Sequence, residues 1–519
     1  MPRQSLLRGM LILSAAGFVS KLLGIVYRIP LARMVGAEGV GLYQMAYPVY
    51  ALVMALSTAG FPVAISFLVA ERSAQKDYAG ARKVLALAAG VLFFSGLFMS
   101  GVLFFGAKNI ADCFLKDGRV YYSLVALSPA IFLTAMMSAL RGYFQGLQWM
   151  TPTAVSQVIE QVVRVAVILF LAWRLMPYGV EFAAAGAALG AAAGGAAGLA
   201  VLIFFYAVSR GHGVSGMPVS AAGAGREGSA LLLKRMAQLA GPISLGALVM
   251  PLIQTLDAFV VPARLRAAGL PLETATALFG QLSGMAAVLV NLPAVVTVAL
   301  ATSLVPSIAA AFSLQQRSAV LYRLDRSLAA AMLACLPAAA GFWCLGREIC
   351  DLLYGVPQAG IPLRALAPAV VFLGAYQVSA AALQGIGLTS LPVRHLCVAG
   401  ALKTVLNYYL VTIPPLGIVG AALATDLAFA AAAALNFLSL SRLIGHRLPW
   451  DAVLLKPGLA VTIMAVLIKS LHRTAAGGTY IETLALILAG GAVYCAAAVL
   501  VGAVGRQDLR LLLGLLGSK

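Results

Sequence analysis

The feature that most constrains this chain is a series of long apolar stretches that recurs from one end to the other. The hydrocarbon core of a bilayer is about 30 Å thick, and a helix needs roughly twenty apolar residues to cross it. Of the 519 residues, 62% are hydrophobic and only 10% are charged, a composition that no soluble fold of this length explains. The sequence therefore predicts an all-α polytopic membrane protein with about 14 transmembrane helices.

We expect spans that follow the apolar stretches. Their approximate limits are 7–30, 40–70, 84–107, 119–145, 152–176, 181–209, 236–262, 275–313, 327–346, 360–386, 391–413, 417–441, 452–470 and 480–503. The segments 40–70 and 275–313 are too long for one straight span, and each contains two prolines. Kinked helices are therefore expected in both.

The basic residues predict how the chain is oriented. A net charge of +19 would suggest a nucleic-acid partner in a soluble protein, but here the basic residues lie mostly in short loops. If the N-terminus is inside, the inner loops hold the larger share of Lys and Arg, as the positive-inside rule requires. The sequence thus predicts a multi-pass protein of the cell membrane with both termini cytoplasmic, and no nucleic-acid partner.

A Gly- and Ser-rich segment and a set of internal matches divide the chain. The inner loop around Ser209–Arg235 reads as a flexible linker. On either side of it, ALRG at 139–142 matches ALQG at 382–385, and GAAL recurs at 186–189 and 420–423. The common order of such matches predicts two pseudo-symmetric six-helix lobes. The expected divisions are an N-lobe at 1–209, a cytoplasmic linker at 210–235, a C-lobe at 236–441, two further helices at 442–503 and a cytoplasmic amphipathic tail at 504–519.

The first apolar stretch carries two cations. Gly17, Lys21, Gly24 and Arg28 follow at spacings of four, three and four, which places them on one face of a helix. A cation near the bilayer centre costs roughly 2.5–3.5 kcal/mol on insertion scales. We interpret this face as the lining of a polar cavity within the membrane. The alternative is that Lys21 and Arg28 extend to the two membrane edges.

Other polar residues within predicted spans are candidate substrate contacts. Gln157, Glu160 and Arg164 share one face of the fifth span, and Glu160 and Arg164 are four residues apart, so a purely structural ion pair is the alternative. The remaining candidates are Gln254, Asp257 and Lys403. Glycine and proline positions that could act as hinges are Gly24, Pro62, Pro251 and Pro306.

The opening ninety residues or so carry a family resemblance. SKLLGIVYRIPLARMVGAEGVGLYQMAYPVY, LSTAGFPVAISFLVAER and DYAGARKVLALA resemble the stage V sporulation protein B family of polysaccharide exporters. This family belongs with MATE-type exporters, Wzx-type flippases and MviN-type lipid II flippases. Lys21 stands where MviN-type flippases have an arginine, and Tyr27 stands where they have the next one, so that charge arrangement does not carry over whole.

The resemblance implies a function. It implies a flippase, not an enzyme, that moves an undecaprenyl-pyrophosphate-linked sugar such as lipid II across the cytoplasmic membrane by alternating access, for spore cortex or cell wall synthesis. Lys21 and Arg28, with either Lys403 or Arg164, would receive the pyrophosphate. Expected partners are the lipid-linked oligosaccharide, membrane lipids and cell-wall synthesis enzymes.

Other functions stay open. A MATE-type drug or ion antiporter shares the fold, but a cationic drug needs a negatively charged cavity. A non-transporting assembly factor for wall synthesis is the other alternative. No P-loop occurs in the sequence and no cofactor is expected, whereas Asp257, Glu160 or Asp426 could couple transport to a proton or sodium gradient.

Overall fold

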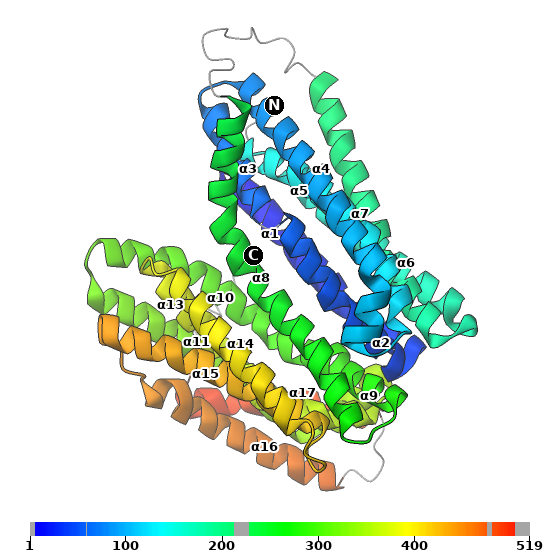
Figure 1. Ribbon diagram of the computed structural model, residues 1–519. Coiled ribbons are helices and arrows are strands. Elements are labelled where there is room, and N and C mark those ends of the chain that lie inside the picture. The colour runs from blue at the N-terminus through cyan, green and yellow to red at the C-terminus, as the bar shows by residue number, and fades with distance from the viewer. Residues whose placement is uncertain (1–5, 59, 212–227, 475–479, 504–519) are drawn as a thin grey trace. The chain divides into compact units, whose positions relative to one another are not determined.

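The structure, a computed structural model, describes residues 6–58, 60–211, 228–474 and 480–503. Among these residues it contains helices, turns and loops and no strand. The described chain forms two compact units (Figure 1). The predicted tail at 504–519 and most of the predicted linker lie outside the described residues.

Unit 1 comprises residues up to Arg266 together with Leu270–Gly280. Its helices are α1 (Leu6–Val26), α2 (Arg28–Thr58), α3 (Phe61–Ala74), α4 (Tyr78–Asn109), α5 (Val120–Gly146), α6 (Thr151–Leu175), α7 (Val180–Gly211), α8 (Ser229–Ala267) and α9 (Leu272–Phe279), with the short helices η1 (Ile110–Leu115) and η2 (Met176–Tyr178).

Unit 2 comprises Ala267–Gly269 and the chain from Gln281 onward. Its helices are η3 (Gly280–Ala286, whose first residue belongs to unit 1), α10 (Ala287–Ser313), α11 (Arg317–Tyr354), η4 (Pro357–Ala359), α12 (Gly360–Ala365), α13 (Ala367–Gly385), α14 (Ser390–Leu410), α15 (Ile418–Ile444), η5 (Asp451–Leu455), α16 (Lys456–Thr474) and α17 (Tyr480–Leu500). The lobe boundaries at 209 and 235 stay a prediction.

Twelve helical stretches among the described residues are long and apolar enough to cross a membrane. One of them, Leu11–Ala74, runs through α1, α2 and α3 and so covers two predicted spans. Helix α14, which carries Arg394 and Lys403, is not among the twelve. A multi-pass membrane protein is confirmed, while the count of fourteen remains a prediction.

The first two spans are divided differently from the prediction. Helix α1 ends at Val26, and Arg28 begins α2 instead of lying within the first helix. Pro30 has no N–H to bond to the carbonyl of Val26, which weakens the helix at this point. The predicted kink within 40–70 is a break before α3, where Gly60 adopts φ 79° and Pro62 occupies the first turn.

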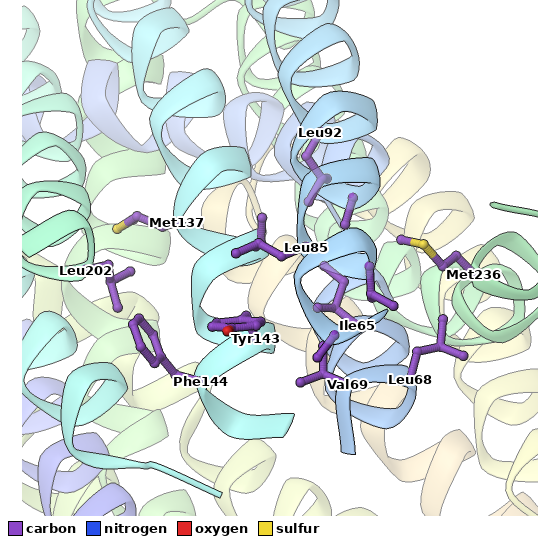
Figure 2. Packing of buried hydrophobic residues seen from close by; sticks show 14 of the residues in the cluster. Ile65, Leu68, Val69, Leu85, Leu92, Met137, Tyr143, Phe144, Leu202 and Met236 are labelled. Atoms are coloured by element: carbon purple, nitrogen blue, oxygen red, sulfur yellow. The ribbon is translucent and has the colours of Figure 1, made fainter. Parts of the chain in front are cut away.

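The core of unit 1 joins α3, α4, α5 and α8 (Figure 2). Ile65 and Leu68 of α3 and Phe144 of α5 are almost fully buried, and Met236 brings the start of α8 against α3. An ion pair of 2.9 Å between Arg235 and Glu71 fixes the same contact. Close packing of this kind is what holds helices together in lipid, where burial of apolar surface contributes little.

The matched motifs make equivalent contacts in the two units. A methyl group added at Gly142 would lie 2.8 Å from the carbonyl oxygen of Pro62, and one added at Gly385 would lie 3.0 Å from that of Val305. Likewise, Gly186 presses on Leu171 and Gly420 presses on Leu410. Helix pairs that meet through the same motifs are what an internal repeat requires.

Candidate functional site

The polar face of α6 contains a half-buried charge network. Glu160 accepts hydrogen bonds from two arginines, at 2.8 Å from Arg141 of α5 and 2.5 Å from Arg164 of α6. Arg141 also donates to the hydroxyl of Ser156 at 2.7 Å. One carboxylate thus faces two guanidinium groups, and positive charge is in excess.

Some polar atoms of this face have no hydrogen-bond partner. Nε of Arg164 and Oε1 of Gln157 are buried and make no hydrogen bond in the described part of the chain. A buried polar group without a partner costs about 1–3 kcal/mol. Both atoms are therefore available to a ligand that supplies an acceptor and a donor.

A ladder of tyrosines on α2 lies beside this network. The rings of Tyr43 and Tyr47 stack with centroids 5.6 Å apart, and those of Tyr47 and Tyr50 are 5.7 Å apart. All three tyrosines lie near Arg164. Tyr50 also forms a hydrogen bond with Thr134 of α5.

Arg28 stands at the other end of the ladder. It is half-buried, hydrogen-bonds to the side chain of Tyr27 and lies near Tyr43 and Tyr47. Tyr27 in turn is hydrogen-bonded to Tyr43. The ladder therefore connects Arg28 to Arg164 through side chains of one unit.

We call these residues the arginine–tyrosine cluster. It consists of Arg28, Tyr43, Tyr47, Tyr50, Arg141, Glu160 and Arg164. Guanidinium groups bind phosphate oxygens with paired hydrogen bonds, and tyrosines combine an apolar ring with a hydroxyl. The cluster has the chemistry to bind an anionic phosphate next to a polar, partly apolar group such as a sugar.

A glycine ridge on α7 holds α6 in place. Glycines at 186, 190, 194 and 198 repeat every four residues and lie along one face of the helix. A methyl group added at Gly194 would lie 2.6 Å from the carbonyl oxygen of Glu160, and one at Gly190 would lie 2.9 Å from that of Arg164. Such close backbone contact fixes the helix that carries the charge network.

Helix α1 covers another part of α6. The hydroxyl of Ser20 donates to the backbone oxygen of Gln157 at 3.4 Å, and Gly24 faces the amide of Gln161. Lys21, next to Ser20, is exposed and takes part in no ion pair among the described residues. The structure therefore links Arg28 to Arg164 through the tyrosines that both of them neighbour, whereas it shows no contact of Lys21 with these side chains among the described residues.

The other predicted contacts lie elsewhere. On α8, Gln254 is exposed and Asp257 is half-buried, while Lys403 is half-buried on α14 of unit 2. Among the predicted hinges, Pro251 lies within α8 and Pro306 within α10. No geometry described here tests the roles of these residues, so they stay predictions.

Sequence reasoning did not single out Arg141 or the tyrosines. Arg141 lies near the end of the predicted span 119–145, in the ALRG motif, and its side chain turns to Glu160. Tyr43, Tyr47 and Tyr50 follow at spacings of four and three, which is a one-face helical pattern that could have revealed them.

A second polar network lies at the opposite end of α5 from Arg141. Asp117 is buried and accepts from Arg119 at 2.8 Å and from the hydroxyl of Thr276 on α9 at 3.0 Å. Arg119 also pairs with Glu38 of α2. The hydrogen bonds to Asp117 and Glu38 raise the pKa of the Arg119 guanidinium above its ordinary value, so it stays charged.

Known proteins resemble this chain in sequence. Residues 6–312 match the family described as polysaccharide biosynthesis protein. Stage V sporulation protein B of Bacillus subtilis is 34% identical over 427 residues, which are 82% of this chain and 81% of that protein. The lipid II flippase MurJ of Bacillus subtilis is 28% identical over 457 residues, which are 85% and 83% of the two chains.

Solved structures share the fold. A lipid II flippase MurJ in an inward closed conformation superposes with a TM-score of 0.71 at 17% identity, over 95% of this chain and 99% of that one. An inward-facing MATE family multidrug transporter gives a TM-score of 0.65 at 16% identity, over 82% and 94%. The predicted MATE- and MviN-like fold is thereby confirmed.

Three of the four named proteins are described as flippases or transporters, which agrees with the many membrane helices and identifies the chain as a transporter and not an enzyme. The family match covers more than half of the sequence. The chain belongs to the polysaccharide biosynthesis protein family, together with stage V sporulation protein B.

Proposed function

We propose that this protein moves a sugar linked to undecaprenyl pyrophosphate, such as lipid II or a related wall precursor, across the cytoplasmic membrane by alternating access. We further propose that the transported precursor is used to synthesise the spore cortex or the cell wall. Two relatives support it by their descriptions, one as a sporulation protein and one as a lipid II flippase. Both termini would face the cytoplasm, as the loop charges predict.

The arginine–tyrosine cluster is the observation that carries this proposal. A pyrophosphate is insoluble in hydrocarbon and needs cations along its path. Arg28, Arg141 and Arg164 outnumber the single carboxylate of Glu160. Arg28 and Arg164 would bind the phosphates, and the tyrosine ladder would contact the sugar, while the polyprenyl chain stays in lipid.

The charge balance also bears on the alternatives. The arginine–tyrosine cluster has a net positive charge, and it would therefore repel a cationic drug. A drug antiporter is therefore the weaker candidate. An assembly factor that recruits cell-wall enzymes would need no cations within its membrane helices, where each one is costly.

Coupling to an ion gradient is part of the proposal. Asp426 on α15 is 5% exposed, and neither of its carboxylate oxygens has a hydrogen bond of normal geometry among the described residues, although the N–H of Ala369 is nearby. Glu160, by contrast, is neutralised by two arginines. We therefore favour Asp426 as the group that binds a proton or sodium ion.

Reconstitution tests the proposal. Purified protein in proteoliposomes should accelerate the transbilayer movement of fluorescent lipid II above that of empty vesicles. A cationic dye in the same vesicles should move no faster than without protein. Transport of the dye with no movement of lipid II would instead favour the drug antiporter.

A further inference from the structure

Two basic side chains of unit 2, Arg364 of α12 and His472 of α16, face the carboxylate of Glu348 near the end of α11. Nη2 of Arg364 lies 3.8 Å from Oε2 of Glu348, and Nε2 of His472 lies 3.5 Å from Oε1. Lys469 and Arg364 both lie near Cys344, one turn before Glu348. Arg347 is exposed beside them, and we call Arg347, Arg364, Lys469 and His472 the basic corner.

The basic corner is held in place by close backbone contact. A methyl group added at Gly346 would lie 2.9 Å from Cγ of Arg364, and one at Gly360 would lie 2.4 Å from Cα of Arg347. The stem of Arg364 therefore rests directly on α11. This contact restricts the rotation of the Arg364 side chain and holds its guanidinium beside Glu348.

Two carboxylates, Glu348 and the half-buried Asp351 one turn after Arg347, do not balance the charges of Arg347, Arg364 and Lys469. The side chains of Arg364 and His472 are 46% and 43% exposed, and the distances to Glu348 are longer than those of good ion pairs. Arg347 and Lys469 are exposed as well. The basic corner thus presents free N–H donors and a positive charge to its surroundings.

The predicted side of the membrane makes the positive charge of the basic corner unusual. The topology predicted from the loops puts the ends of α11 and α16 on the outer side of the membrane, where basic residues are disfavoured. Three Lys and Arg side chains gather there nevertheless. A concentration of cations against the general trend calls for an anionic partner.

The neighbouring side chains are apolar and exposed. Trp343 is 56% exposed, Ile361 58% and Leu471 40%, and each lies within four residues of a member of the basic corner. Trp is typical of the membrane interface, where its ring lies at the level of the headgroups. Cations with exposed apolar side chains close by in the sequence match a phosphate headgroup and the upper part of its acyl chains.

We propose that the basic corner binds the headgroup of an anionic phospholipid, with phosphatidylglycerol as the probe. Basic pockets between membrane helices recognise such headgroups by charge. The exposed apolar side chains favour a lipid over a soluble phosphate compound, because only the lipid brings acyl chains to them. The inference does not depend on which cargo the protein moves.

Native mass spectrometry of the full chain in detergent tests this site. Phosphatidylglycerol is titrated against the wild type and the double variant Arg364→Gln/Lys469→Gln, with phosphatidylcholine as the neutral lipid. Removal of two cations should weaken the first bound phosphatidylglycerol on the order of tenfold. The matched control is Lys108→Gln/Arg174→Gln, which removes two exposed cations from helix ends of unit 1.

The proposal predicts that the control binds phosphatidylglycerol like the wild type and that phosphatidylcholine binds all three proteins weakly and equally. Equal phosphatidylglycerol affinity in the wild type and Arg364→Gln/Lys469→Gln would overturn it. So would an equal loss in the control, which would indicate only a general effect of charge. Displacement of the lipid by inorganic pyrophosphate at equal concentration would assign the site to soluble phosphates instead.

Discussion

Glu160 is the residue on which the charge balance of α6 depends. Its two oxygens each bind a different arginine, and both partners come from helices that the sequence places in the membrane. Without this carboxylate, Arg141 and Arg164 would face each other as like charges in a low-dielectric environment. The ionic network is therefore structural as well as a candidate binding site.

Glu160→Gln should lower the stability of the folded protein by about 3 kcal/mol, because breaking a buried ion pair leaves its partners uncompensated. A clear drop in the apparent Tm, measured in detergent by intrinsic fluorescence, is expected. Glu273→Gln, an exposed change of the same kind on α9, should leave the Tm unchanged. Equal Tm values for the two variants would show that the network contributes nothing to stability.

Asp117 has the corresponding role in the second network. Asp117→Asn should cost about 3 kcal/mol, since it leaves Arg119 without its buried partner. Thr276→Val should cost only about 1 kcal/mol, because it removes a single hydrogen bond to a carboxylate that Arg119 still neutralises. Chemical or thermal unfolding would measure both.

The exposed Asp112→Asn is the control for this pair of changes. Thr276→Val more destabilising than Asp117→Asn would contradict the assignment of Arg119 as the main partner of Asp117. It would instead point to the packing of α9 against α2 as the dominant interaction.

At the scale of elements, close helix contact through glycine positions the charged face of α6. The ridge on α7 meets the backbone of α6 at the level of Glu160 and Arg164, so that α6 cannot rotate without a clash. The polar side chains are thereby directed toward α2 and α5. Fixed backbone contacts of this kind replace the hydrophobic effect as the organising force in lipid.

Gly194→Ala should destabilise the protein by roughly 1–3 kcal/mol through overpacking, although alanine is the better helix former. Gly101→Ala on α4 is the matched control, since a methyl group there meets no atom within 4 Å. The apparent Tm should fall for Gly194→Ala and stay level or rise for Gly101→Ala. A rise for both would mean that the α6–α7 contact tolerates a side chain.

Much of the fold was predictable from the sequence, because membrane helices need long apolar stretches that composition reveals. The face shared by Glu160 and Arg164 was also predictable, because residues four apart on a helix lie on the same face. The break at Tyr27 was missed, and with it the assignment of Arg28 to α2. A single proline near a helix start gives too weak a signal to place such a break.

The tertiary part of the site could not be predicted. Arg141 lies 19 residues from Glu160 in the chain and reaches it only because α5 and α6 meet at a particular angle. Lys21 and Arg28 were expected on one face, yet the structure leaves Lys21 exposed and encloses Arg28 among tyrosines. Helical periodicity describes one helix and says nothing of which neighbour covers it.

At the scale of the whole molecule, transport requires an energy source as well as a binding site. Asp426 belongs to unit 2, whereas the arginine–tyrosine cluster belongs to unit 1. Substrate binding and ion binding would therefore be assigned to different units. The two functions should be separable by mutation.

Asp426→Asn should remove the response of transport to an ion gradient while leaving basal movement of lipid II measurable. The reason is that an amide cannot gain or lose a proton and binds sodium more weakly than a carboxylate. Rates in proteoliposomes with and without a pH or sodium gradient would show this. A variant that still responds to the gradient like the wild type would remove Asp426 from the coupling role.

The most direct test of the account compares lipid II movement in proteoliposomes for the wild type, Arg28→Gln and the exposed control Arg174→Gln. Loss of a charged hydrogen-bond donor to the pyrophosphate should slow movement by roughly tenfold or more. Only Arg28→Gln should be slow, with its fold intact by Tm. Wild-type speed in Arg28→Gln would contradict the proposed role of the arginine–tyrosine cluster.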